Sequence, residues 1–361
     1  MGARVTYPSV DAMLEPAELA DLLGRPVDSV ALAPMTTLGW SSTEADFRQV
    51  FVDGDPTPAA VLKIVQWSRD WHAIATEDTR GREVAIWECG VLDRLPPAMG
   101  HAVRGAARFD DGAALLMDDL SLHFLPGGVP ATPERARGVL GAMAAMHARF
   151  WEDPPNGDLG TAVCPLERLL TRLSATTLTS LGGVLPDNEL VATFPEGWDL
   201  LAGVVDPGVA RDLRALADDP TPFTSALDGY PTTLLHGDLR IANVAWDGTR
   251  AIAVDWQPTV APPAYDLAYF MFDVHRGGSP LHPEETIATY HEMLAAELGP
   301  AGSWSWWDDQ LDICLAAVVA MMASPLALGE GEHDPRRDPP WDSIHWWVAR
   351  AARGLRLIEA A

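Results

Sequence analysis

Residues 234–257 read LLHGDLRIANVAWDGTRAIAVDWQ and contain three polar side chains whose chemistry makes sense only together. Asp238 follows an apolar approach, and Asn243 comes shortly after it, so one tight loop can aim both side chains at one point. Residues 244–254 read as two short strands around an Asp-Gly pair, which is a strong signal for a hairpin turn. The hairpin returns the chain, and we therefore expect Asp255 to lie beside the loop.

Two carboxylates and one amide oxygen at a common rim suit a hard cation such as Mg²⁺. The spacing also matches the phosphoryl-transfer template, in which an Asp orients or deprotonates a substrate hydroxyl while an Asn and a second Asp hold metal. Asp238 fills the first place, and Asn243 and Asp255 fill the other two. The competing interpretation is a chance loop with capping Asp and Asn residues, which the joint spacing disfavours.

HGDLRIAN at residues 236–243, followed by AVDWQ at 253–257, resembles the aminoglycoside phosphotransferase and choline kinase superfamily. PPAYDLAYF at residues 262–270 is similar to its ecdysteroid-kinase-like branch. The resemblance implies an α+β, bilobal, protein-kinase-like fold. A small antiparallel sheet with one key helix would form the N-terminal lobe, residues 1–117, and residues 118–131 would be the hinge and crossover. A larger, mostly helical lobe, residues 132–361, would hold the catalytic loop and the acceptor pocket.

The composition narrows the classes of partner. The chain has 361 residues and a formal net charge of −26, which makes nucleic acid and anionic membranes improbable partners. It has no apolar run of about 18 residues and no signal-peptide pattern at its start, so we expect a soluble, cytoplasmic protein. We expect this protein to be a monomer or a homodimer. The three cysteines are odd in number and widely spaced, which predicts free thiols.

The N-terminal part reads as a helix followed by a meander of strands. A helix is expected over residues 12–23, and strands over 29–33, 44–52 and 59–66. The connection TTLGWSST at residues 36–43 has one glycine, so Ser41 and Ser42 are candidates for phosphate contacts in place of a glycine-rich loop. The alternative for this connection is a simple polar hairpin.

Lys63 is the one cation in the apolar run AVLKIV at residues 60–65. A lysine in such a strand is costly unless it faces solvent or finds anions, so its expected partners are nucleotide phosphates and a carboxylate. Glu83, on a helix expected over residues 79–92, is the favoured carboxylate, with Glu77 and Glu88 as competitors.

The segment after the next two strands is the expected hinge between lobes. Strands are expected over residues 102–109 and 113–117, and the second runs directly into Asp118-Asp119-Leu120. The resemblance implies that main-chain groups from Asp118 to Leu120 bind the adenine edge of ATP, with Met117 at the back of that pocket.

The C-terminal part reads as helices separated by Gly, Pro and Asp. Expected helices begin at Pro133, after a Thr132 cap, and cover residues 166–181, 188–192, 207–216, 265–274, 283–298, 307–328 and 341–360. His147 is expected within apolar packing. The resemblance makes Asp266 a scaffold residue that caps its helix or steadies the catalytic loop, and His236 a brace of that loop. Arg240 stands where a cation can compensate carboxylates or contact the γ-phosphate.

These patterns predict an ATP-dependent and Mg²⁺-dependent phosphotransferase acting on a small-molecule hydroxyl. The alternatives are a kinase-like binding module with weak or no turnover and a metal-dependent hydrolase, which would not need Lys63 and Glu83. The acceptor stays open across antibiotics, sugars, amino alcohols and sterol-like alcohols. The acidic balance favours a cationic acceptor, whereas the fourteen tryptophans favour an apolar one.

Overall fold

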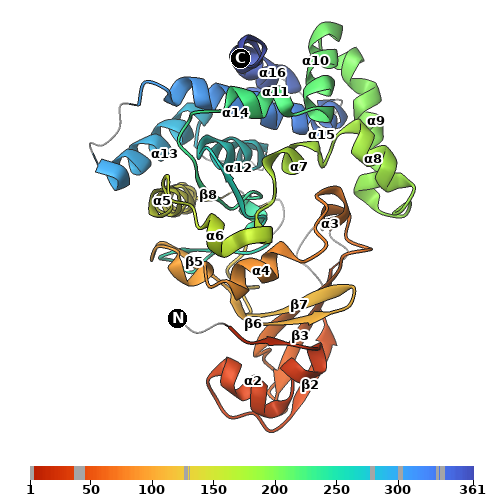
Figure 1. Ribbon diagram of the computed structural model, residues 1–361, viewed down its shortest axis with the longest axis vertical. Coiled ribbons are helices and arrows are strands. Elements are labelled where there is room, and N and C mark those ends of the chain that lie inside the picture. The colour runs from red at the N-terminus through yellow and green to blue at the C-terminus, as the bar shows by residue number, and fades with distance from the viewer. Residues whose placement is uncertain are drawn as a thin grey trace.

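The computed structural model describes residues 4–35, 45–125, 129, 131–276, 281–299, 304–330, 333 and 338–361. Ser41 and Ser42, the predicted phosphate contacts, lie outside these residues. Strands gather at one end of the molecule and helices at the other, as Figure 1 shows with the sheet in red to yellow and the helices in green to blue. This is the predicted α+β kinase-like arrangement of an antiparallel sheet followed by a largely helical part.

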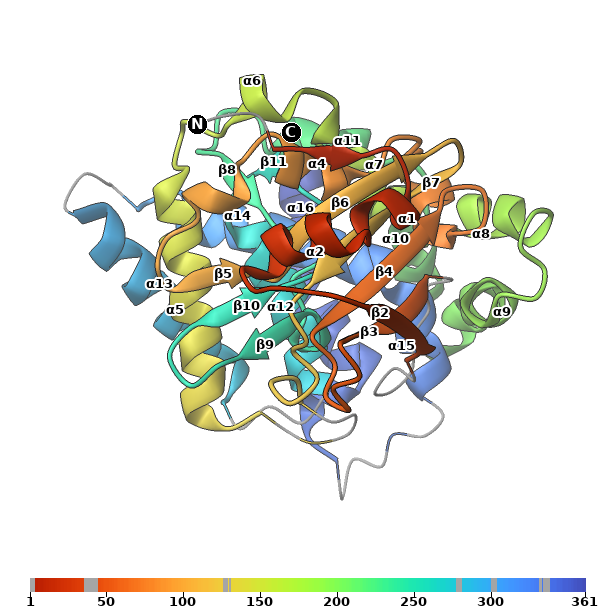
Figure 2. The ribbon, with the colours of Figure 1, turned by 90° about the horizontal axis from the view of Figure 1, so that it is seen from below.

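The N-terminal sheet has six strands in the order β1-β6-β7-β4-β3-β2 within the described chain (Figure 2). All neighbours pair antiparallel except β1 with β6, which are parallel. The strands are β1 (Thr6–Tyr7), β2 (Val30–Pro34), β3 (Asp46–Val52), β4 (Ala60–Gln66), β6 (Val103–Phe109) and β7 (Gly112–Met117). The predicted strands are therefore present with shifts of one or two residues, and β1 was not predicted.

The alternation of side chains along β4 decides which way Lys63 points. Leu62 packs in the outer core with Met13 and Leu19, whereas Val61 belongs to the core shared with the helical part. Successive side chains of a strand face opposite sides, so Lys63 lies on the same face as Val61, toward the helices. Lys63 is consequently only 7% exposed, in the middle of the sheet.

The outer face of the sheet is covered by two short helices instead of the single helix predicted over residues 12–23. These are α1 (Val10–Met13) and α2 (Pro16–Leu23), which Figure 2 shows lying across the strands. Pro16 begins the second helix, because proline suits a first helical turn and cannot continue a preceding one. Gly24, with a φ of 66°, ends it, at the end of the predicted range.

The helix predicted over residues 79–92 is shorter, and another helix precedes it. Asp78 accepts hydrogen bonds from the backbone N–H groups of Gly81 and Arg82, both at 2.8 Å, and this cap sets the start of α4 (Arg82–Glu88). Asp70 caps α3 (Trp71–Ala75) in the same way through the N–H of Ala73. Both helices face the helical part of the chain.

The predicted hairpin is present and adds to a small second sheet. Its strands β9 (Val244–Trp246) and β10 (Ala251–Ala253) pair antiparallel, and β10 also pairs parallel with β5 (Met99–His101). The stretch from Asp238 to Asp255 is thereby docked against the N-terminal part. β8 (Thr233–Leu235) leads into that stretch and pairs with β11 (Thr259–Ala261), which follows it.

The remaining elements are mainly helical. They are α5 (Pro133–Arg149), α6 (Asn156–Leu159), α7 (Leu166–Thr171), α8 (Ala175–Gly182), α9 (Glu189–Val204), α10 (Pro207–Asp218), α11 (Thr221–Ala226), α12 (Ala264–Arg276), α13 (Pro283–Leu298), α14 (Trp307–Met321), α15 (Ala323–Glu330) and α16 (Ile344–Ala360). Short 3₁₀ turns are η1 (Leu92–Arg94), η2 (Gly160–Ala162), η3 (Ile241–Asn243) and η5 (Pro340–Asp342). Thr132 caps α5 and α13 has its predicted bounds, whereas two predicted helices, over 166–181 and 307–328, are each split into two.

Helix α14 is the centre of the helical core. Nearly all of its side chains are buried, and it packs against α12 and α16. No single helix among the described residues is long and apolar enough to cross a membrane. α14 and α15 together reach the required length and composition, but the chain bends by 65° between them.

His275, on α12, gives this core a measurable dependence on pH. The side chain is buried, and its Nε2 lies 3.3 Å from the Thr286 hydroxyl on α13. Burial, and then the charge of His282, lowers the pKa of His275 to about 4. In the unfolded chain the imidazole takes up a proton near pH 6.5, whereas in the folded protein it does so only near pH 4. The contribution to stability is therefore present at neutral pH, and the folded state loses stability relative to the unfolded chain as the pH falls from about 6.5 toward 4.

We predict that replacing His275 by glutamine, His275→Gln, removes this dependence. Between pH 7 and pH 5 the wild-type protein should lose about 2 kcal/mol more unfolding free energy than the variant, measured by urea unfolding. His345→Gln is the matched control, because the His345 side chain is 62% exposed and meets water in both states. Equal pH slopes for the wild type and His275→Gln would contradict the prediction.

Candidate active site

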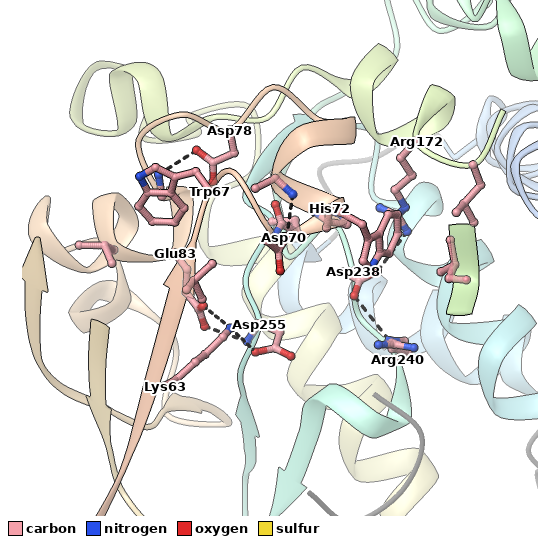
Figure 3. Close-up of a pocket in the computed structure, with 18 of the residues that line it drawn as sticks. Lys63, Trp67, Asp70, His72, Asp78, Glu83, Arg172, Asp238, Arg240 and Asp255 are labelled. Carbon is pink, nitrogen blue, oxygen red and sulfur yellow. Dashed lines mark hydrogen bonds and ion pairs between the residues drawn. The ribbon is translucent and has the colours of Figure 1, made fainter. Parts of the chain in front are cut away.

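The site begins with Lys63, which joins two segments that are distant in sequence (Figure 3). Its Nζ donates to Glu83 Oε2 and to Asp255 Oδ1, both at 2.6 Å. Glu83 lies in the first turn of α4, and Asp255 lies two residues after the end of β10. The predicted pairing of Lys63 with Glu83 is confirmed. Its competitors bind elsewhere, since Glu77 pairs with Arg168 and Glu88 with Arg108, each at 2.7 Å.

The two carboxylates keep the Lys63 ammonium charged although it is buried. Burial alone would lower the pKa of Lys63, but the charges of Asp255 and Glu83 outweigh it and raise the pKa above its usual range. For Asp255, burial alone would raise the pKa, but the charge of Lys63 outweighs burial and lowers the pKa. Asp255 also has a φ of 60°, which a non-glycine residue adopts only under constraint. Its N–H donates to Glu83 Oε1 at 3.0 Å, which supplies that constraint.

Asp238 is surrounded by donors. Its Oδ1 accepts from Arg172 Nη2 at 3.0 Å, and its Oδ2 accepts from Asn243 Nδ2 at 2.9 Å. Arg240 Nε lies 3.5 Å from the same Oδ2. Burial would raise the pKa of Asp238, but the charges of Arg240 and Arg172 hold it well below its usual range. This carboxylate is therefore ionised, and it can receive a hydrogen bond from a substrate hydroxyl.

A buried network holds the Asp238 loop in place. Asp266 accepts from the N–H of His236 at 2.8 Å and from the N–H of Gly237 at 3.0 Å, which confirms that it steadies the loop. Gly237 has a φ of 80°, and a Cβ there would lie 2.0 Å from Gln257 O, so glycine is required. His236 Nε2 lies 3.0 Å from Val254 O, and its Nδ1 accepts from the Asp238 N–H, which confirms the predicted brace.

His147 was expected within apolar packing, and that expectation was incomplete. Its Nε2 lies 3.3 Å from Asp266 Oδ2, and its Nδ1 lies 2.6 Å from the Tyr290 hydroxyl. A buried imidazole needs such partners, and sequence periodicity cannot reveal them because they come from α12 and α13.

The donor set fits a hard cation. Asn243 Nδ2 donates both to Asp238 O and to Asp238 Oδ2, at 2.9 Å each, which leaves the amide oxygen of Asn243 free to face a ligand. Asp255 supplies a carboxylate on the neighbouring strand end. Among the described residues there is no cluster of three or more His, Cys, Asp or Glu side chains that could hold a metal. A cation at this place would therefore need oxygens from a nucleotide or from water, as is usual for Mg²⁺.

A cavity of about 180 Å³ opens beside these groups. Figure 3 shows Lys63, Glu83 and Asp255 at one side of it and His72, Arg172, Asp238 and Arg240 at the other. Its walls come from β4, β7, α3, α4, the segment from Arg172 to α9, the Asp238 loop, α12 and the end of α14. The lining side chains are Lys63, Val65, Trp67, Asp70, Trp71, His72, Ala73, Asp78, Gly81, Glu83, Val84, Ala113, Leu115, Arg172, Leu173, Leu190, Phe194, Asp238, Arg240, Asp255, Gln257, Tyr269 and Met322.

The predicted hinge residues are not part of this cavity. Across the sheet, Lys63 lies opposite Leu115 and Val65 lies opposite Ala113. Met117 lies two residues beyond Leu115 along β7, opposite Val61. Met117 is buried and does not line this cavity, and its expected place at the back of an adenine pocket stays a prediction. Asp118 donates its N–H to Ala102 O at 2.9 Å, and Leu120 O accepts from the His123 N–H at 2.8 Å. Adenine contacts at Asp118 and Leu120 stay predictions.

Several residues that line the cavity were not predicted from the sequence, above all Arg172. It follows α7, and its side chain is only 2% exposed, with its guanidinium 5.1 Å from the Tyr269 ring. One signal was available, since a lone arginine in the apolar segment LLTRLS needs a buried anion, as Lys63 does. The identity of that anion could not be read from the sequence, because Asp238 is 66 residues away. His72, Trp67 and Gln257 carry no comparable signal.

We predict that Asp266→Ala destabilises the protein by roughly 3 kcal/mol, because it leaves the N–H groups of His236 and Gly237 and the His147 ring without their buried acceptor. Urea unfolding measures this cost. Asp273→Ala, on the same helix, removes a single acceptor of the Ile241 N–H and should cost only about 1 kcal/mol. A cost for Asp266→Ala no larger than that of the control would show that Asp266 does not hold the loop.

Comparison with known proteins gives one family match. The model of the phosphotransferase enzyme family matches residues 42–302, well over half of the chain. This range includes Lys63, Glu83, Arg172 and the entire stretch from Asp238 to Asp255. A search of curated proteins found no match to the chain.

Solved structures similar to this chain include three kinases or phosphotransferases. Spectinomycin phosphotransferase, in complex with ADP and spectinomycin, is 11% identical, with 96% of this chain and 98% of that chain covered and a TM-score of 0.47. A GDP complex of an aminoglycoside 2′-phosphotransferase IIIa variant is 13% identical, with 96% and 98% covered and a TM-score of 0.46. An ethanolamine kinase from Plasmodium vivax is 13% identical, with 90% and 81% covered and a TM-score of 0.47.

Proposed function

Because the chain belongs to the phosphotransferase enzyme family, we propose that it transfers the γ-phosphate of ATP to a hydroxyl group of a small molecule. The observation that carries this proposal is the position of Lys63, 2.6 Å from both Glu83 and Asp255. A buried ammonium between a helix carboxylate and a strand-end carboxylate is the arrangement that grips nucleotide phosphates in kinases. Asp238 and Asn243 are joined to each other in the adjacent loop.

In this proposal Asp238 acts on the acceptor. Its ionised carboxylate orients the hydroxyl and accepts the proton as the oxygen attacks the γ-phosphate. Arg172 and Arg240 hold the carboxylate in place, and Arg240 is near enough to interact with the transferred phosphate. Most of the rate then comes from positioning and from charge neutralisation, and little covalent chemistry is asked of the protein.

The remaining assigned residues serve the nucleotide. Asn243 and Asp255 would hold Mg²⁺, which neutralises charge on the phosphates. Lys63, fixed by Glu83, binds the non-transferred phosphates, and main-chain groups at Asp118 and Leu120 receive the adenine, with Ser41 and Ser42 as further phosphate donors. We accordingly assign residues 1–117 to the nucleotide-covering lobe, 118–131 to the connection, and 132–361 to the lobe with the acceptor pocket.

The PPAYDLAYF segment supports a finer placement in the ecdysteroid-kinase-like branch. In this segment Asp266 is fully buried under the catalytic loop, and its neighbours Tyr265, Leu267 and Phe270 are core residues. We keep the branch as part of the proposal. The family assignment rests on the longer match and does not depend on it.

The direct test is transfer of the γ-phosphate from Mg-ATP to a panel of hydroxylated compounds, followed by ³¹P NMR. A phosphate ester is the expected product. Stabilisation of the protein by Mg-ATP without ester formation on any compound would instead indicate a binding module, and phosphate release alone would indicate a hydrolase.

For the assigned base we predict that Asp238→Asn lowers kcat by about a thousandfold and leaves Mg-ATP affinity within a few fold. The amide keeps the size of the side chain but cannot take a proton from the hydroxyl. Calorimetric titration with Mg-ATP provides the folding control. Unchanged turnover in this variant would remove Asp238 from the role of base.

For the metal site we predict that Asp255→Ala abolishes the Mg²⁺ dependence of ATP binding. Calorimetric titrations of ATP with and without Mg²⁺ should give distinct affinities for the wild type and the same weak affinity for the variant. Asp247→Ala, a hairpin-turn change on the same hairpin, should retain the wild-type difference. Persistence of Mg²⁺-dependent binding in Asp255→Ala would show that another residue holds the cation.

A further inference from the structure

The part of the cavity beyond Asp238 has a chemical character that the net charge of the chain does not suggest. Under the proposed function, the alcohol that Asp238 orients enters this space, because Asp238 lines it, and the walls then select the acceptor. The cavity wall includes the apolar and aromatic side chains of Trp67, Trp71, Leu190 and Phe194. These walls favour a largely apolar or aromatic body.

The carboxylates that line the cavity are already engaged. Asp70 and Asp78 accept backbone N–H bonds at the starts of α3 and α4. Glu83 and Asp255 pair with Lys63, and Asp238 pairs with Arg172. An acceptor ammonium beside the reacting hydroxyl would lie near the positive charges of Arg172 and Arg240, and the carboxylate at that place, Asp238, is already paired with Arg172.

Four polar atoms of the wall are buried without a hydrogen-bond partner in the described chain. They are Arg172 Nη1, His72 Nε2, Gln257 Oε1 and Arg240 Nε, the last of which lies 3.5 Å from Asp238 Oδ2. Arg172 is the most informative, because its Nη2 already binds Asp238 while its Nη1 is left over on the same rigid guanidinium. Figure 3 shows the Arg172 side chain descending beside His72 toward Asp238. An orphan buried donor of this kind costs free energy unless a ligand supplies an acceptor.

His72 adds a neutral group to this set. Its burial, and then the nearby charge of Arg172, lowers the pKa of His72 to about 3. The ring is thus uncharged at neutral pH and can exchange a hydrogen bond with an uncharged ligand group. It provides no negative charge for an ammonium.

Building on the proposed function, we infer that the phosphate-accepting substrate is an alcohol with a largely apolar body and no ammonium group. It carries a second oxygen, close to the reacting hydroxyl, that accepts a hydrogen bond. Arg172 Nη1 donates to that oxygen, which belongs to a carboxylate, a carbonyl or a second hydroxyl, while Asp238 binds the reacting hydroxyl. Gln257 Oε1 accepts from a further donor of the ligand. Arg172 thereby selects the acceptor as well as positioning the Asp238 carboxylate.

The test uses four probes, three of which share one carbon skeleton. 3-Phenyllactate carries a carboxylate beside its hydroxyl, 3-phenylpropane-1,2-diol is neutral, and phenylalaninol carries an ammonium, while kanamycin is a polycation. Binding is measured by saturation-transfer NMR with the full-length protein saturated with the Mg²⁺ complex of β,γ-imido ATP. We expect phenyllactate and the diol to bind at least about tenfold more tightly than phenylalaninol and kanamycin.

Variants assign the preference to particular side chains. Arg172→Gln should reduce the ratio of phenyllactate to phenylalaninol affinity by about tenfold or more, a ratio that a general loss of structure would not change selectively. Arg168→Gln is the control, since Arg168 lies on α7 just before Arg172 and pairs with Glu77 at the surface. If Arg172→Gln fails to fold, Gln257→Met provides the second test, through weaker binding of the diol relative to phenyllactate.

Three results would overturn the inference. They are tighter binding of phenylalaninol or kanamycin than of the other probes, an unchanged ratio in both variants, and no binding of any probe. Phosphate transfer is measured separately on the panel of hydroxylated compounds, so a protein that binds these probes but phosphorylates no compound of the panel contradicts the proposed function and leaves the inference intact. A protein that phosphorylates an aminoglycoside supports the proposed function and contradicts the inference.

Discussion

The ion pairs of Lys63 are the constraint around which the site is arranged. A buried ammonium is tolerable only with close anions, and its two partners come from α4 and from the end of β10. The same contacts fix the direction of the sheet relative to the stretch from Asp238 to Asp255. Glu83 uses its second oxygen to hold the N–H of Asp255, and so keeps that residue in its left-handed conformation. Glu83 thus binds both the side chain of Lys63 and the backbone of Asp255.

Features written in local sequence patterns were predictable. Strand alternation, the Asp-Gly turn of the hairpin and the Pro133 and Pro283 helix starts are each specified by a few neighbouring residues. The partner of Lys63 could be anticipated as well, because the order of a buried strand and then a helix limits which carboxylates can reach it. Helix α3 was missed because it is barely one turn long and leaves no periodic pattern.

The polar partners that give the site its character depend on tertiary structure and could not be predicted. Arg172 with Asp238, and His147 with Asp266, join elements whose approach is decided by the packing of the helical part. Net charge is limited in a related way. The chain is strongly acidic, but carboxylates of the cavity wall pair with Lys63 and Arg172 or accept backbone N–H bonds at helix starts, so total charge does not describe the field inside one pocket.

The cavity is walled from both parts of the chain. Trp67, Trp71 and His72 come from the sheet side, whereas Arg172, Leu190 and Phe194 come from the helical side. Laboratory evolution of new selectivity would therefore gain little from libraries confined to one half of the gene. Combinatorial changes on opposite walls would be needed, since any ligand filling the space touches both at once.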